Sequence, residues 1–361
     1  MWLYSHTNYL AFLFREGVLM SNVFMLLVAL AVILLGATVF TNGLEWFGKK
    51  MNLSDRAVGS VFAAVGTALP ETLIPIIAIL FGSKDAGHKI GVGAIIGAPF
   101  MLGTLAYFIS SLAVMVNRKK RENYPTMRVD TIVMRRDIEY FLVLYSIAIF
   151  STFLLNHPIF KVTIALTLIL LYGAYVLKTL AGTDGNHEIE EADLDPCYFA
   201  PNSRDPAFSI IFSQVISSLL LIVWGAYIFV EKVQIISGQI GVSPFILSMI
   251  IAPIATELPE KFNSVIWINK GKDTLAIGNI TGAMVFQGSV ITAIGILMTD
   301  WDLTPAAFIT VILTFASVGL AYWQIRSQNK LTPYTLLAGG AFYFIFLVLI
   351  LIGKDSKRFF I

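Results

Sequence analysis

Long apolar segments separated by short polar stretches dominate this chain. A bilayer core of about 30 Å needs roughly 20 apolar residues per helix, and ten segments satisfy that length. The pattern predicts membrane spans near residues 22–41, 57–82, 90–116, 138–156, 158–180, 207–230, 243–268, 274–298, 303–323 and 332–353. Lipid offers the backbone no hydrogen-bond partner, and the segments are too long and too uniformly apolar for barrel strands. We therefore expect an all-α polytopic membrane protein.

Composition supports this class and excludes several others. The chain is 57% hydrophobic and 13% charged, whereas charged residues make up about a quarter of a soluble domain. A net charge of +2 gives no reason to expect nucleic acid as a partner, and Cys197 is the only cysteine. An internal disulfide and a cysteine-based metal site are thus excluded. The four histidines stand outside the apolar segments or at their edges, so we expect no histidine-bound cofactor. The partners implied are inorganic cations and the lipid bilayer.

Basic residues indicate how the spans are oriented. The loop after the third predicted span contains Arg118, Lys119, Lys120, Arg121, Arg128, Arg135 and Arg136. Because basic residues favour the cytoplasmic side, we expect this loop inside and both termini outside, although the basic residues after position 353 weaken the bias. No basic region precedes the first apolar run, so we interpret that run as a retained span and not as a cleaved signal. The protein is expected in a plasma or inner membrane.

An internal repeat relates the two halves of the chain. Residues 67–71 (TALPE) recur 189 residues later as 256–260 (TELPE). Two further pairs of segments match in order: 36–37 with 225–226 and, after a length change of four residues, 93–98 with 278–283. Three matches across this distance indicate a repeat and not a coincidence.

Each half contains five predicted spans, an odd number, so the second half must enter the membrane from the opposite side. Secondary transporters use this inverted-repeat plan and bind substrate near the midplane. We expect a first five-helix repeat at 1–181, an acidic cytoplasmic linker at 182–206 and a second repeat at 207–361. The spacing of the acidic residues at 184–188 resembles a calcium loop, but Ile189 replaces the required glycine, so we interpret this segment as a solvated linker.

Ionisable side chains at bilayer depth need a partner or a purpose because they are costly there. The residues concerned are Glu71, Glu257, Glu260 and Lys261. Helical spacing places Thr67 beside Glu71 and Thr256 beside Glu260. The identical positions of Glu71 and Glu260 in the two repeats favour a cation-binding role. For Glu257 two alternatives stay open, since Lys261 at i+4 could simply neutralise it.

Two prolines are expected to break the helices at these carboxylates. Pro70 cannot donate to the carbonyl of Gly66, and Pro259 cannot donate to that of Ala255. Hard cations such as Ca²⁺ bind about six to eight oxygens from carboxylates, carbonyls and water. Two inverted, broken helices at the midplane would supply such a set.

The third and eighth spans carry matching small-residue pairs. Gly93 with Gly97, and Gly278 with Gly282, have the spacing that permits close helix contact, so we expect them to pack against the broken helices. Asn279 and Gln287 share a face of the eighth span. Their amide oxygens could ligate a cation or make interhelical hydrogen bonds, and the sequence favours neither role.

These motifs resemble those of a known family. Residues 66–71 (GTALPE) resemble the Gly-Thr-Ser-Leu-Pro-Glu signature of the sodium/calcium exchanger superfamily, and 255–260 (ATELPE) resemble its second copy. Residues 278–283 (GNITGA) are similar to the Gly-Asn-x-x-Gly-Ser-Asn motif that follows. The chain is identified as a divergent, prokaryotic-type member. The resemblance implies ten helices, a central calcium site built by Glu71 and Glu260, and flanking sodium sites.

Several family oxygens are absent from this chain. The residues at the corresponding positions are Ala68, Ala98, Pro99 and Leu102 in the first copy and Ala283 and Met284 in the second, while Glu257 replaces the serine of the second signature. Divalent-cation transport therefore carries over from the resemblance better than sodium coupling does. A carboxylate in a dry, oxygen-poor site resists ionisation, which slightly favours a proton as the counter-ion. Sodium stays possible because Thr67, Thr256, Asn279 and Gln287 remain.

The function expected is secondary active antiport of Ca²⁺, or another divalent cation, against H⁺ or Na⁺ by alternating access. A cation channel or leak pathway is the first alternative. An intramembrane enzyme using Glu71 and Glu260 as an acid/base pair is the second, but no catalytic serine, histidine or metal constellation accompanies them. We further hypothesise that Lys261 pairs with Glu257 and supplies the charge of a bound monovalent ion. No cofactor is expected beyond the transported cation.

Overall fold

The computed structural model describes residues 2–51, 68–154, 158–181 and 195–353, without side chains at 2–16, 180–181, 258–260 and 353. The described chain consists of helices and connecting loops. The helical elements are α1 (Trp2–Lys50), α4 (Leu69–Phe81), α5 (Lys84–Met101), η2 (Leu102–Ala106), α6 (Tyr107–Val116), η3 (Arg118–Lys120), α7 (Thr131–Phe150), η4 (Ser151–Phe153), α8 (Pro158–Ala181), α9 (Phe208–Ile240), α10 (Pro244–Asn269), α11 (Asp273–Phe286), η5 (Gln287–Ile291), α12 (Thr292–Met298), α13 (Pro305–Gln328) and α14 (Pro333–Gly353).

The described helices have the length and surface of membrane spans. Seven of them are long and apolar enough to cross a bilayer, and α4 and the first part of α10 are shorter apolar helices. Large apolar side chains lie exposed along these helices, including Leu170, Leu177, Phe344 and Leu351. Such a surface suits lipid better than water. The prediction of an all-α polytopic membrane protein is confirmed at this level.

Most predicted spans match an observed helix closely. The ninth span, expected at 303–323, is α13, while α1 and α9 extend well beyond the first and sixth predicted spans. The break expected at Pro259 is absent, because α10 continues through it to Asn269. A proline removes only one backbone hydrogen bond, and neighbouring groups can support the helix around it. In the first copy, α4 begins at Leu69 with Pro70 in its first turn, where no N–H is needed.

The chain forms two compact units. Unit 1 comprises Met1–Ile90 and Asn186–Leu247, and unit 2 comprises Gly91–Gly185 and Ser248–Ile361. Each unit therefore contains parts of both sequence halves. The helices α1, α4 and α9 belong to unit 1, and α6, α7, α8 and α11–α14 belong to unit 2.

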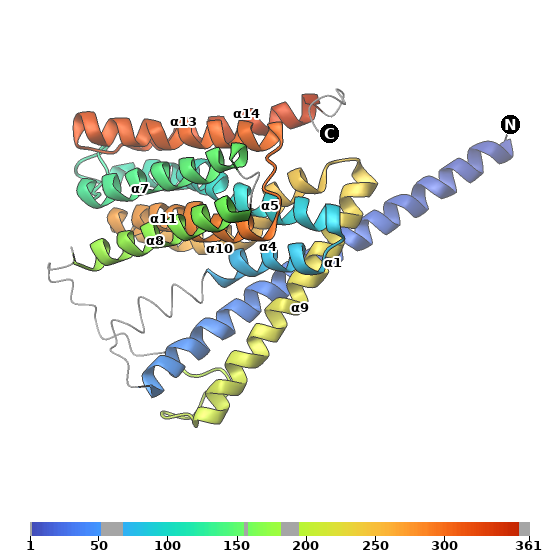
Figure 1. Ribbon diagram of the computed structural model, residues 1–361, viewed down its shortest axis with the longest axis horizontal. Coiled ribbons are helices and arrows are strands. Elements are labelled where there is room, and N and C mark those ends of the chain that lie inside the picture. The colour runs from blue at the N-terminus through green and yellow to red at the C-terminus, as the bar shows by residue number, and fades with distance from the viewer. Residues whose placement is uncertain (1, 52–67, 155–157, 182–194, 354–361) are drawn as a thin grey trace. The chain divides into compact units, whose positions relative to one another are not determined.

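In unit 1, α1 and α9 run antiparallel and side by side (Figure 1). A Cβ added at Gly36 would lie 2.8 Å from Cγ1 of Ile222, and one added at Gly225 would lie 2.9 Å from Cγ1 of Ile33. Gly36 corresponds to Gly225, and Ile33 to Ile222, under the 189-residue offset. Each of the two equivalent glycines thus packs against the equivalent isoleucine of the other helix.

The end of the expected linker is fastened to these two helices. Trp46 Nε1 donates to the carbonyl of Asp195 at 2.9 Å, and Gln214 Nε2 donates to Asn42 Oδ1 at 3.0 Å. Cys197 is fully buried and donates to Gln214 Oε1. Residues 182–194 lie outside the described residues. The part of the linker that is described from Asp195 onward packs on α1 and α9, because its polar groups find partners there.

In unit 2, the third and eighth spans share one local design. Each is an α-helix interrupted by a five-residue π-helical segment, η2 in the third span and η5 in the eighth. Thr104 and Ser289, which correspond in the repeat, each donate to the carbonyl four residues earlier. Gly97 lies against the backbone of Met249 in α10, where an added Cβ would approach the carbonyl oxygen to 2.2 Å. A Cβ added at Gly278 would have no described atom within 4 Å apart from its own helix backbone. The expected close contact is therefore seen in the first copy only.

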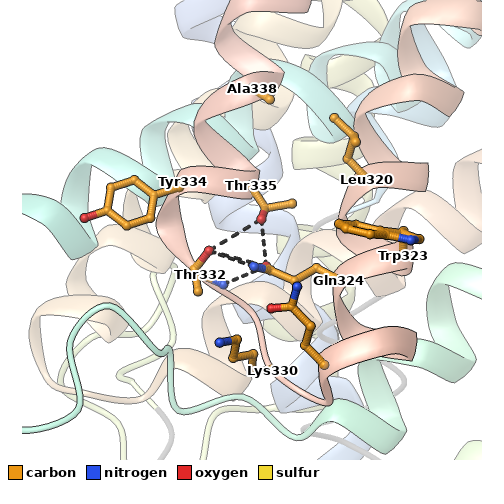
Figure 2. Close-up of a pocket in the computed structure, with 9 residues that line it drawn as sticks. Leu320, Trp323, Gln324, Lys330, Thr332, Tyr334, Thr335 and Ala338 are labelled. Carbon is orange, nitrogen blue, oxygen red and sulfur yellow. Dashed lines mark hydrogen bonds between the residues drawn. The ribbon is translucent and has the colours of Figure 1, made fainter.

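Polar contacts hold the loops of unit 2. Arg121 makes a two-pronged ion pair with Asp273, with nitrogen–oxygen distances of 2.7 and 2.8 Å, and Asp273 is fully buried. This pair joins the basic loop after the third span to the α10–α11 turn. At the turn between α13 and α14, Gln324 bonds Thr332 and Thr335 beside a surface pocket (Figure 2).

Candidate cation site

Glu71 lies in the first turn of α4, in unit 1. Its side chain is 8% exposed on a helix that otherwise consists almost wholly of apolar residues. The amino end of a helix carries partial positive charge, which stabilises a carboxylate placed there. A buried carboxylate in an apolar helix is what a cation-binding residue of a membrane protein requires. Gly66 and Thr67, expected beside it, lie outside the described residues.

In unit 2, α10 and the start of η5 bring Glu257 and Gln287 together. The Nε2 of Gln287 donates a hydrogen bond to Oε1 of Glu257, and the two side chains are 3% and 1% exposed respectively. The Oε1 of Gln287 has no hydrogen-bond partner within the described part of the chain. Buried amide oxygens are normally satisfied, so this oxygen is an available ligand.

Lys261 reaches the same cluster from one turn further along α10. Its Nζ donates to Oδ1 of Asn279 at 2.8 Å and lies 3.9 Å from Oε2 of Glu257. Lys261 is 2% exposed, whereas Asn279 on α11 is exposed. The pairing of Lys261 with Glu257 expected from their spacing is therefore present. The cluster combines a carboxylate, an ammonium and two amides, and it is open at Asn279.

The remaining predicted ligands of the second copy lie differently. Thr256 is buried, and its hydroxyl donates to the carbonyl of Ala252 at 3.1 Å, inside its own helix. Ala255 is half-buried within the continuous helix α10. The backbone of Glu260 belongs to α10, but its side chain lies outside the described residues.

Besides Asp273 in the pair with Arg121, sequence reasoning missed a second buried carboxylate, Asp137 in α7. It is 3% exposed and accepts hydrogen bonds from Thr281 at 3.0 Å and from Tyr175 at 3.1 Å. Thr281 is two residues from Asn279, so Asp137 fastens the helix that carries the amide. Its neighbours Arg135 and Arg136 make the position resemble a loop. The sequence signal that could have revealed Asp137 is an acidic residue directly before an apolar run.

The described part of the chain has no cluster of three or more histidine, cysteine, aspartate or glutamate side chains. The site in unit 2 is a small polar cluster in an apolar bundle, with one oxygen available and one ammonium already bound. The pocket in Figure 2 contains none of these residues.

Comparisons with known proteins agree with these features. Residues 21–180 and 210–352 match the family described as sodium/calcium exchanger protein. The chain is 23% identical over 288 residues to the inner membrane protein YrbG of Escherichia coli, covering 78% of this chain and 83% of that protein. It is 24% identical over 334 residues to the putative antiporter CaxA of Alkalimonas amylolytica, covering 88% and 96%. The solved structure of the H⁺/Ca²⁺ exchanger CAX superposes with a TM-score of 0.69 at 16% identity, covering 91% of this chain and 82% of that one.

Proposed function

The chain belongs to the sodium/calcium exchanger family, and from that membership we propose that it exchanges Ca²⁺, or another divalent cation, for H⁺ or Na⁺ by alternating access. Cation antiport is the activity of this family, so the protein is a membrane transporter and not an enzyme. The observation that carries the proposal is Glu71, a buried carboxylate in the first turn of an apolar helix, whose counterpart in the second repeat is Glu260.

The proposed architecture has ten membrane helices in two inverted five-helix repeats, with both termini outside. Two features support it. The reciprocal contacts of Gly36 with Ile222 and of Gly225 with Ile33 are those of antiparallel, repeat-related helices. The π-helical segments also begin at equivalent positions of the third and eighth spans, at Leu102 and Gln287.

We assign the transported divalent cation to Glu71 and Glu260. The hydroxyl groups of Thr67 and Thr256 and the carbonyls of Gly66 and Ala255 would complete its oxygen ligands. Mixed carboxylate, carbonyl and hydroxyl oxygens are the ligands that Ca²⁺ prefers. Glu257, Asn279 and Gln287 form the neighbouring cluster with Lys261.

The test is divalent transport by glutamine variants of the signature glutamates. Glu71→Gln and Glu260→Gln remove one charge each and keep the side-chain shape, so the folded protein should survive. Uptake of radiolabelled Ca²⁺ into proteoliposomes should fall to background for both. A matched control is Glu231→Gln, since Glu231 is a solvent-exposed glutamate of α9 whose partner is Lys232.

Monodisperse Glu71→Gln protein with near-normal uptake would refute the assignment of the site. Counterflow distinguishes antiport from a channel, because only a carrier accelerates uptake when unlabelled substrate is present on the opposite side. Equal uptake with and without internal Ca²⁺ would establish the channel alternative.

A further inference from the structure

Lys261 places an ammonium group among the buried side chains of unit 2. Its side chain is 2% exposed and that of Glu257 is 1% exposed. A buried ion pair gives little net stability, because both charges must first lose their water. Ionisable groups retained at membrane depth commonly have a function. The position of this ammonium therefore needs an explanation beyond stability.

The groups around Lys261 are ligands suited to a small monovalent cation. Nζ lies 2.8 Å from Oδ1 of Asn279 and 3.9 Å from Oε2 of Glu257. The other carboxylate oxygen accepts from Gln287, whose own amide oxygen is buried without a described hydrogen-bond partner. The carboxylate of Glu257 and the amide oxygen of Asn279, which face the ammonium, are ligands that Na⁺ also accepts. The buried amide oxygen of Gln287, which makes no described hydrogen bond, would be a third ligand for Na⁺. Of these residues, Asn279 is the exposed one.

We propose that the Lys261 ammonium is a built-in monovalent cation, occupying the position that a free Na⁺ would otherwise take against Glu257, Asn279 and Gln287. An ammonium tethered to α10 cannot leave with the transport cycle. This cluster therefore contributes no transported ion in the native protein, and it becomes an ion site only when the lysine is removed.

A consequence for stoichiometry follows, and this step rests on the proposed function. The carboxylates of Glu71, Glu257 and Glu260 together with the ammonium of Lys261 leave two negative charges. One divalent cation or two monovalent cations balance that charge. We therefore expect electroneutral exchange of one divalent cation for two monovalent ions.

The experiment replaces the tethered cation with a free one. Lys261→Ala leaves Glu257 buried without its ammonium and opens space at the cluster. The thermal stability of the purified, full-length variant is measured in NaCl, in ammonium chloride and in choline chloride at equal ionic strength. We expect a lower melting temperature in choline, and recovery of most of the loss in Na⁺ or ammonium, because both small ions fit where choline does not.

Two control variants isolate the cluster. Lys270→Ala removes an exposed lysine from the turn directly after the same helix and should respond to salt as the native protein does. Glu257→Gln with Lys261→Ala removes both charges, so its stability should depend on the cation no more than that of the native protein does. This double variant also shows that the bundle tolerates the missing lysine.

The possible results distinguish a tethered cation from a purely structural ion pair. Selective stabilisation of Lys261→Ala by Na⁺ or ammonium supports the proposal. A monodisperse Lys261→Ala protein that is equally stable in all three salts overturns it and leaves a purely structural ion pair. If Lys261→Ala aggregates, purification in NaCl should rescue it while purification in choline does not, and equal aggregation in both also overturns the proposal.

Transport gives a second readout that depends on the proposed function. Divalent uptake by Lys261→Ala should increase about tenfold when Na⁺ is added on both sides, a size typical of coupling between two binding sites. If native protein transports no divalent cation, the proposed function fails, while the thermal measurements still test the tethered ammonium.

Discussion

Leu102 and Gln287 occupy the same position in two similar helices, since each is the first residue of a five-residue π-helical segment. Both side chains are buried, at 0% and 3% exposure. Single π-helical turns inside α-helices occur frequently at functional sites. In the first copy the position holds a hydrocarbon side chain, and in the second it holds an amide bonded to Glu257. The local backbone is thus repeated while the chemistry is present in one copy only.

Gln287→Leu gives the second copy the side chain of the first. The helix should persist, because Leu102 is accommodated at the equivalent position. Glu257 loses a hydrogen bond to a charged group, worth about 1.5–3 kcal/mol. We expect a lower melting temperature. Because Glu257 is then no longer held in place beside the proposed cation site, we also expect divalent uptake per folded molecule to fall about tenfold, a size typical of coupling between two sites.

The matched control for this variant is Gln324→Leu. Gln324 is also a largely buried glutamine of unit 2, but it bonds Thr332 and Thr335 at the α13–α14 turn (Figure 2). It should lose comparable stability and keep its uptake per folded molecule. An equal loss of uptake in both variants would show that general destabilisation, and not the contact with Glu257, explains the effect.

The crossing of α1 and α9 supports a prediction about side-chain size at its two glycines. Gly36→Leu and Gly225→Leu each insert a side chain where even a Cβ would lie under 3 Å from an isoleucine carbon. Overpacking of this kind costs about 1–3 kcal/mol, so both variants should melt earlier. Gly238→Leu, on the exposed surface of α9 with no atom within 4 Å, should melt like the native protein. Similar melting temperatures for all three would contradict the close crossing.

The apolar pattern predicts most of this fold because the bilayer itself sets the length of each span. Expected and observed limits agree at α13 and α14 within a few residues. Other features depend on packing that no local pattern records. The uninterrupted course of α10 through Pro259 is one example, and the π-helical segments at Leu102 and Gln287 are another.

The contacts of the candidate site, too, are predicted from the sequence only in part. The spacing of Glu257 and Lys261 predicts their pairing, because residues at i and i+4 share a helix face. The bond from Lys261 to Asn279 joins two helices, and the sequence leaves the role of Asn279 open. Asp137 escapes prediction because its partners Thr281 and Tyr175 come from distant segments.

Orientation is tested by cysteine labelling in a Cys197→Ser background, where serine can still donate to Gln214 as the thiol does. Lys120→Cys and Asp302→Cys place single thiols at exposed loop positions. Because basic residues surround Lys120, a membrane-impermeant maleimide applied to intact cells should label position 302 and spare position 120. Labelling of both positions, or of neither until the membrane is opened, would contradict the ten-span topology.

The last prediction concerns the counter-ion. Ala68, Ala98, Leu102 and Ala283 lack the side-chain oxygens that the resemblance associates with sodium, and Lys261 already occupies the cluster of Asn279 and Glu257. Protons need only a carboxylate that can hold them, so fewer ligands suffice.

We therefore expect Ca²⁺ uptake into proteoliposomes to follow an imposed pH gradient, and to change little with an imposed sodium gradient at constant pH. Lys261→Ala provides the internal contrast, because Na⁺ can enter its vacated cluster and uptake should then respond to sodium. Native uptake that follows sodium and ignores pH would restore sodium coupling. It would also mean that the oxygens of Thr67 and Thr256, or of unassigned groups, bind the ion in place of the Lys261 cluster.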